Sequence, residues 1–385
     1  MKFIKIAAGA ALALAMVGCG KDAASSADGA ADASSAKSAS AVTSAAKAVV
    51  AKKVYEPKAL SGTTIAVQYR KNTSPALKPL VDALVTNFKT SFSESFANGA
   101  DEEDAAQAKK FYTDSGLESA DIKWALVTVG GVNLAEIEGD KVPDIAVAVA
   151  FDHDMDKIIA ALVASLDEDE KKELVETKVA GVKAWKVDNE SAKADGAEPC
   201  FASLDGTLVL AATTPAVLER LVTLYKGGKG ESSAFASLSS GNDAVLRVFV
   251  PALGELVKKA TEGSETDLSA LDMLIPNGSN ILLGLGDVDL AVLANASGAS
   301  LKLAATTATD GDAESLRTML NAFVTSYVDG LKESTDEEDK LAYSALKDLK
   351  FGGEGKAFVA TMPIPDDLIK KSAEDLSDLS GAFAD

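Results

Sequence analysis

Residues 200–228 read CFASLDGTLVLAATTPAVLERLVTLYKGG and carry the clearest structural signal in the chain. Two apolar runs, 200–204 and 207–212, flank the pair Asp205-Gly206. Because Asp-Gly favours the positive φ angles of a type I′ turn, the two runs are expected to pair as an antiparallel hairpin. This stretch therefore predicts antiparallel β-structure in this part of the chain.

A helix is predicted immediately after this hairpin. Thr214 is a suitable N-cap, Pro215 suits the first helical position, and Gly227-Gly228 is expected to end the helix. Further strands are expected at 63–68, 122–129, 145–151, 174–179, 182–187, 245–250, 281–285, 288–294, 301–306, 349–351 and 356–361. Further helices are expected at 74–96, 102–113, 155–165 behind Asp152 or Asp154, 251–260, 310–331 capped by Asp310 or Asp312, 337–346, and after Pro365.

Part of this order occurs twice. A strand, an Asp-capped helix, a hairpin and a Pro-started helix are expected at about 144–227 and again at about 300–376. The sequence thus predicts an α+β fold of mainly antiparallel sheets with helices packed on one face, in two structurally similar halves at 54–230 and 231–385. In its order of elements this layout resembles uncharacterised secreted bacterial proteins with repeated α+β halves.

The N-terminus has the features of an export signal. Lys2 and Lys5 precede an apolar run at 6–17, which is shorter than the roughly 20 residues of a permanent membrane helix. The run ends at Gly18-Cys19 and resembles the lipobox of bacterial lipoproteins, with Met16 where Leu is usual. The resemblance covers residues 1–20 and implies that 1–18 are removed and that Cys19 is acylated, anchoring the exported chain to a membrane.

Residues 19–53 are expected to form the lipidated cysteine and a flexible linker. Between Ala23 and Ala51, 20 of 29 residues are Ala or Ser, too few large apolar side chains to offset the entropy of ordering. Residues 54–385 carry 31 basic and 55 acidic side chains, so the body is strongly acidic. Its negative field argues against a nucleic-acid partner.

Composition also argues against most metal and catalytic sites. The chain has one His and two Cys, and if Cys19 is acylated, Cys200 is left alone and reads as a small buried residue at a strand start. No metal or other cofactor is expected. The acidic runs at 152–156 and 310–314 lack the Gly and Glu that complete a calcium loop, and both are explained as helix starts.

Catalytic motifs are incomplete or missing. Gly-x-Ser-x-Gly does not occur, and Ser-x-x-Lys at 344–347 lacks its Ser-Asp-Asn and Lys-Thr-Gly partners. A glycosidase with paired carboxylates is disfavoured because aromatic residues make up 5% of the chain, and Trp124 and Trp185 both lie in expected strands as core residues. We assign no catalytic residue.

These observations favour a non-enzymatic envelope lipoprotein with a binding, assembly or scaffolding role and an unknown envelope protein as partner. A carrier of an apolar ligand is the alternative, and a carboxylate-based hydrolase ranks last. Gly20 follows Cys19 in place of the Asp that favours inner-membrane retention in enterobacteria, so the outer membrane is the expected location if the host has one.

Overall fold

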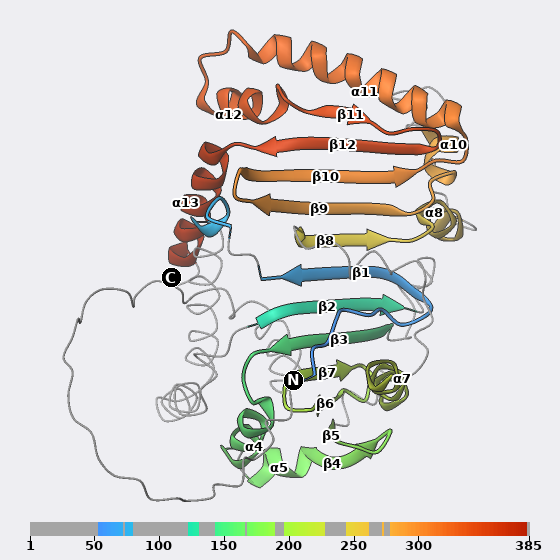
Figure 1. The fold of residues 1–385 in the computed structure, drawn as a ribbon, viewed down its shortest axis with the longest axis vertical. Helices are drawn as coiled ribbons and strands as arrows, with labels where there is room; N and C mark the ends of the chain where they lie inside the picture. The colour runs from blue at the N-terminus through green and yellow to red at the C-terminus, as the bar shows by residue number, and fades with distance from the viewer. Residues whose placement is uncertain are drawn as a thin grey trace, which may run out of the picture.

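A computed structural model of the chain describes residues 53–71, 74–79, 122–130, 143–165, 168–188, 196–227, 244–261, 272 and 278–382. In this part of the chain the strands form one twelve-stranded antiparallel sheet (Figure 1). The strands are β1 Thr63–Arg70, β2 Ile122–Gly130, β3 Asp144–Phe151, β4 Leu174–Val179, β5 Val182–Val187, β6 Cys200–Leu204, β7 Leu208–Ala212, β8 Ala244–Val250, β9 Val288–Asn295, β10 Gly298–Thr306, β11 Lys350–Gly352 and β12 Ala357–Ile364.

The described helices lie between groups of these strands and after the last of them. They are α4 Met155–Ser165, α5 Glu168–Glu173, α7 Pro215–Lys226, α8 Leu253–Thr261, α10 Gly278–Leu283, α11 Asp310–Leu331, α12 Glu337–Leu346 and α13 Asp366–Ala382. Among them, none is long and apolar enough to span a bilayer. Helices combined with one large antiparallel sheet confirm the predicted α+β class.

The sheet has the order β11-β12-β10-β9-β8-β1-β2-β3-β7-β6-β5-β4. Strands β1 and β8 are antiparallel neighbours near its middle. From this pair outward, one side runs β1-β2-β3-β7-β6 and the other runs β8-β9-β10-β12-β11, so both sides follow the same plan, and β5 and β4 extend the first. The boundary predicted between 54–230 and 231–385 stays a prediction.

Two hairpins have type I′ turns, as Asp205-Gly206 predicted for one of them. Asp205 and Gly206 have φ angles of 52° and 65° and join β6 to β7. Ala180 and Gly181, at 48° and 76°, join β4 to β5 in the same way. Positive φ at both central positions defines the type I′ turn, whose twist matches that of the strands. Helix α7 follows β7 as expected, with Thr214 as N-cap and Gly227 in the left-handed region at its end.

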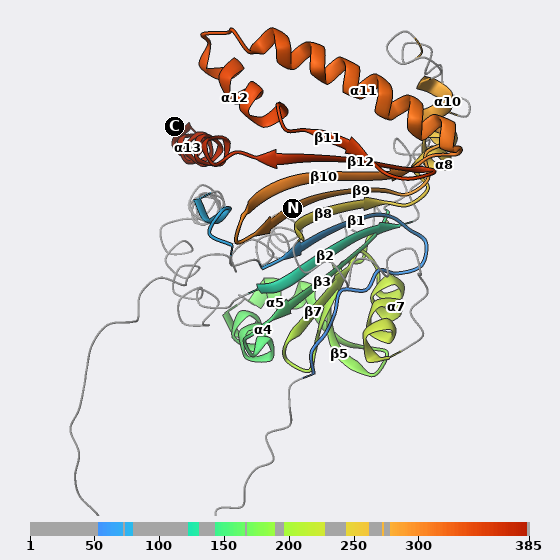
Figure 2. The same cartoon turned by 45° about the horizontal axis from the view of Figure 1, so that its top comes forward.

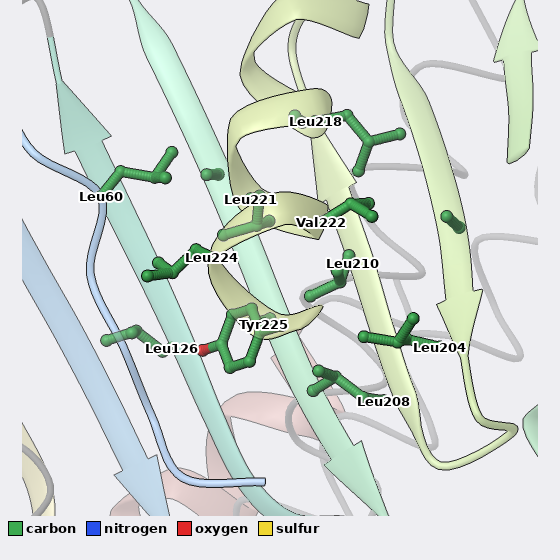
Figure 3. Packing of buried hydrophobic residues seen from close by; sticks show 14 of the residues in the cluster. Leu60, Leu126, Leu204, Leu208, Leu210, Leu218, Leu221, Val222, Leu224 and Tyr225 are labelled. Carbon is green, nitrogen blue, oxygen red and sulfur yellow. The ribbon is translucent and has the colours of Figure 1, made fainter. Parts of the chain in front are cut away.

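The largest apolar core lies between α7 and one face of β2, β3, β6 and β7. Leu218 and Val222 of α7 and Leu208 and Leu210 of β7 are all fully buried in it (Figure 3). Small side chains on the same face, such as Ala148 of β3, let the helix approach the sheet closely.

Helices also cover the opposite face, which differs from the expectation of helices on one face. Leu316 of α11 packs with Ala305 and Phe358, and the pairing register places these two residues on the face that points away from α7. Figure 2 shows α11 and α7 at opposite ends of the sheet. The sequence left the choice of face open, because central strands such as β3 are apolar on both sides.

Two local predictions are wrong. Residues 281–285 were expected to form a strand, but α10 covers Gly278–Leu283, since a short apolar run fits a buried helix as well as a strand. Helix α11 is capped by Thr309, not by Asp310 or Asp312; the Asp312 side chain instead accepts hydrogen bonds from the Thr309 backbone and hydroxyl and completes a capping box.

The helix expected at 74–96 falls only partly within the described residues. The Ser74 hydroxyl accepts a hydrogen bond from Ala76 N at 3.3 Å and donates one to Asn295 O at 2.6 Å, which fixes the start of this segment against β9. Its continuation beyond Pro79 and the helix expected at 102–113 lie outside the described residues.

Candidate functional site

The described chain begins with an extended segment, residues 53–61, which we call the strap. Its side chains alternate: Tyr55, Pro57 and Ala59 are buried, whereas Glu56 and Lys58 are exposed. Alternation with a period of two is the pattern of an extended backbone lying on a surface, and Pro57 disfavours a helical conformation at the residue before it. The strap lies beside α7 and precedes β1 (Figure 3).

Tyr225, in the last turn of α7, holds the strap by its backbone. The Tyr225 hydroxyl accepts a hydrogen bond from Lys58 N at 3.0 Å and donates one to Lys58 O at 3.3 Å. Figure 3 shows this hydroxyl pointing toward the strap. The ring is 2% exposed, and burial raises the pKa of Tyr225 well above its usual range, so the hydroxyl stays protonated and can donate.

Aromatic rings surround this anchor point. Trp124 of β2 stacks on Tyr225 with centroids 6.2 Å apart, and Tyr55 of the strap meets Tyr225 edge-on at 6.1 Å. The indole Nε1 of Trp124 also donates to Tyr55 O at 2.8 Å. The three rings thus combine apolar contact with a hydrogen bond to the strap backbone.

Polar contacts fix the outer end of the strap. The Tyr55 hydroxyl donates to the Asp205 carboxylate in the β6–β7 turn, and burial together with Asp205 raises the pKa of Tyr55. Lys53 Nζ donates to Tyr225 O at 3.3 Å, at the carbonyl end of α7, where a cation interacts favourably with the helix dipole. The Lys53 ammonium also lies 5.0 Å from the centroid of the Tyr55 ring.

The inner end of the strap is held in the same manner. Arg220 of α7 donates to Ser61 O at 2.8 Å at this end, and closer to the outer end Arg70 of β1 pairs with Glu56 at 3.1 Å. We call the strap together with its partner side chains on the body the clasp. Those partners are Arg70, Trp124, Asp205, Arg220 and Tyr225.

The predicted lipidation residue, Cys19, and the linker at 23–51 lie outside the described residues. The described chain begins at Lys53, after the predicted linker, and its first nine residues form the strap. The clasp therefore binds the beginning of the described chain, before it enters β1.

The acidic run at 152–156 stands at the start of α4. Met155 N donates to Gly206 O at 2.8 Å, so the β6–β7 turn covers the first turn of the helix. The carboxylate of Asp152 contacts Nδ1 of His153, and Asp154 pairs with Lys157 at 3.6 Å. Within the described ranges no three His, Cys, Asp or Glu side chains converge to hold a metal ion.

Three other residues considered in the sequence analysis are buried in strands of the sheet. Cys200 is 2% exposed at the start of β6, and Trp124 and Trp185 are 4% and 8% exposed on β2 and β5, as predicted. Burial raises the pKa of the Cys200 thiol to about 12. Ser344 lies in the last turn of α12, and Lys347 is the C-cap residue of that helix.

Comparison with known proteins gives structural matches only. No family model and no curated protein matches the chain. Among solved structures, crystal forms IV, III and I of the protein TP0453 are similar, with TM-scores of 0.41, 0.38 and 0.36 and sequence identities of 8%, 9% and 9%. The matches cover 82%, 83% and 83% of this chain and 94%, 96% and 96% of those chains.

Sequence reasoning missed the clasp. Residues 54–61 read VYEPKALS, and the alternation of Tyr55, Pro57 and Ala59 with polar residues was the available signal. The partners of the strap are far away in sequence: 167 positions separate Lys58 from Tyr225. No local pattern connects them.

Proposed function

We propose that this chain is an envelope lipoprotein, anchored through an acylated Cys19, whose body serves a non-enzymatic binding, assembly or scaffolding role outside the cytoplasm. The observation that supports this most directly is the clasp. The strap comes directly after the predicted Ala/Ser-rich linker in the sequence. Side chains of the body contact the strap along its length. In this proposal the membrane is a partner through the lipid, and the second partner is an envelope protein.

The position of β1 gives the clasp a mechanical purpose. Strand β1 is hydrogen-bonded on both sides, to β2 and to β8, in the middle of the sheet. Without the clasp, a force applied to the linker would act directly on β1, the strand that joins the β2 side of the sheet to the β8 side. Because the strap is bound to α7 and β2 before the chain enters β1, the clasp bears that load first.

Substitution of Cys19 tests the anchor. In cells that process lipoproteins, the wild-type chain is expected to fractionate with membranes and to incorporate labelled fatty acid, and Cys19→Ala is expected to lose both properties. Cys200→Ala is the matched control, because it removes the other cysteine and should keep both. Fatty-acid labelling that persists in Cys19→Ala would refute the proposal. Because Gly20 follows Cys19, we propose the outer membrane as the location in a host that has one.

One observation supports the alternative, a carrier of an apolar ligand. Leu246 of β8 and Leu290 of β9 are 44% and 38% exposed. Val248, next but one to Leu246, pairs directly with Leu290, so the two leucines share the face of the sheet that points away from α7. An apolar ligand lying across β8 and β9 would cover both side chains.

Native mass spectrometry on the mature chain from Gly20, purified gently from cells, tests the carrier. A copurifying apolar mass that is lost in the double variant Leu246→Ser, Leu290→Ser would support the carrier, and a chain without any bound mass would refute it.

A hydrolase is the least supported function. Among the residues whose burial the structure describes, no Asp or Glu is buried, so the buried acid pair that such an enzyme needs would have to come from the remaining residues.

A further inference from the structure

Helix α11 carries an aromatic pair that the rest of the described chain leaves exposed. Phe323 and Tyr327 are 65% and 48% exposed and stack on each other, with centroids 6.2 Å apart and planes inclined by 4°. They continue the side of the helix that begins with Leu316, at helical spacings of seven and eleven residues. Leu316 packs on the sheet, whereas the aromatic pair lies further along the same side without such cover.

The segment of α11 around this pair is uncharged. The sequence from Thr318 to Val328, TMLNAFVTSYV, holds no charged residue, although a quarter of all residues in the chain are charged. Thr318, Asn321, Ala322, Thr325 and Ser326 are exposed along it. The neighbouring helix α12, EEDKLAYSAL, opens with three acidic residues. A neutral helical surface with two exposed aromatic rings is the composition of a protein interface.

We propose that this surface, the α11 face of residues 318–328, binds a second copy of the same chain through antiparallel packing of the two α11 helices. The two copies would be related by a two-fold axis that passes between Phe323 and Tyr327. Phe323 of each copy would then pack on the partner's Tyr327, so the same two residues form the contact in both copies. Each body is strongly acidic, and this neutral segment is where two copies approach with the least repulsion.

A bilayer fits the same surface less well. Segment 318–328 offers no Lys or Arg to anionic headgroups.

Helix α11 lies far from the clasp. The clasp is near β7, whereas α11 packs on β12, seven strand spacings away. At about 4.8 Å per spacing this distance is about 34 Å. If the chain is anchored as proposed above, two copies on one membrane present α11 at the same height. The equal distance of the two α11 helices from the membrane depends on the proposed lipid anchor. The proposed contact between the helices does not depend on that anchor.

The contact is small. Eleven helical residues span about 16 Å, and a helix pair of that length buries less than the roughly 1,200 Å² of a standard interface. We therefore expect a reversible dimer with a dissociation constant above about 1 µM.

Sedimentation velocity tests the proposal on the chain from Gly20 onward, without lipid, at concentrations of about 1–300 µM. The wild-type chain is expected to show a concentration-dependent dimer, and Phe323→Ser with Tyr327→Ser is expected to weaken association at least about tenfold. Val175→Ser, on β4 far from α11 in the sheet order, removes a 39% exposed apolar side chain and should leave association unchanged. Circular dichroism and thermal melting check that each variant is folded.

A charge exchange tests the antiparallel geometry. Phe323→Lys and Tyr327→Glu should each be monomeric alone, and an equimolar mixture should recover association, because one Lys then faces one Glu across the axis. A wild-type monomer throughout the concentration range, or a dimer unaffected by the double serine variant, would overturn the proposal. Binding of lipid-free protein to phosphatidylglycerol vesicles that is lost with Phe323 and Tyr327, without self-association, would overturn it in favour of a membrane surface.

Discussion

Replacing Tyr225 by Phe removes one oxygen atom from the clasp and leaves its apolar contacts in place. The ring would still stack on Trp124 and contact Tyr55. The backbone N–H and C=O of Lys58 would lose their partner. Leaving a formerly paired polar group without its hydrogen bond costs about 1–3 kcal/mol.

We expect Tyr225→Phe to lower the free energy of unfolding by about 1–3 kcal/mol, since loss of the buried hydroxyl's own desolvation cost offsets part of the two lost bonds. For a body of this size, with an unfolding entropy of about 2.1 cal/mol/K per residue, this corresponds to a melting temperature lower by roughly 1–5 °C. Urea unfolding measures the energy. Hydrogen exchange of peptides covering residues 53–61 should accelerate, because Lys58 N–H is no longer protected.

Tyr343→Phe is the matched control, because it makes the same chemical change on α12, away from the strap. This variant should unfold like the wild type and keep the exchange rates of residues 53–61. If Tyr225→Phe and Tyr343→Phe gave the same unfolding midpoint and the same exchange of the strap, the clasp would contribute nothing to holding the strap, and our reasoning would be refuted.

Three further predictions follow from burial and backbone geometry. Burial raises the pKa of the folded Cys200 thiol to about 12 from an ordinary value of 9.0, so the free energy of unfolding should fall by about 1.4 kcal/mol per pH unit above about pH 9. Cys200→Ala should remove this pH dependence in urea titrations between about pH 8 and about pH 10.5. Gly353→Ala should destabilise by more than about 1 kcal/mol, because at φ 110° its Cβ would lie 2.2 Å from Ala357 O, whereas Gly352→Ala meets no atom within 4 Å; equal melting temperatures would contradict this. Leu218→Ala, in the core under α7, should cost about 2–5 kcal/mol in chemical denaturation, and a loss below about 1 kcal/mol would show that the site is not close-packed.

The local elements were predictable where the chain carries specific turn and cap residues. Asp205-Gly206, Thr214-Pro215 and Gly227 act within a few residues of themselves, and β6, β7 and α7 formed as expected. Prediction failed at 281–285, where an apolar run without turn residues has no preferred period, and the buried position of Ile281 beside Leu316 decided for a helix.

The sequence by itself determined the α+β class, the order of most strands and helices, and the buried positions of Cys200, Trp124 and Trp185. These features depend on local conformational preference and on hydrophobicity, which each short segment carries with it. The lipidation of Cys19 stays a prediction of the sequence.

Only the tertiary structure decided that all the described strands join one sheet with β1 and β8 at its middle, and that helices cover both faces. It alone placed Tyr225 against Lys58 to form the clasp and left Phe323 and Tyr327 exposed. Pairing and exposure depend on contacts between residues up to 167 positions apart, and the free energy of such contacts exists only once the chain has brought them together.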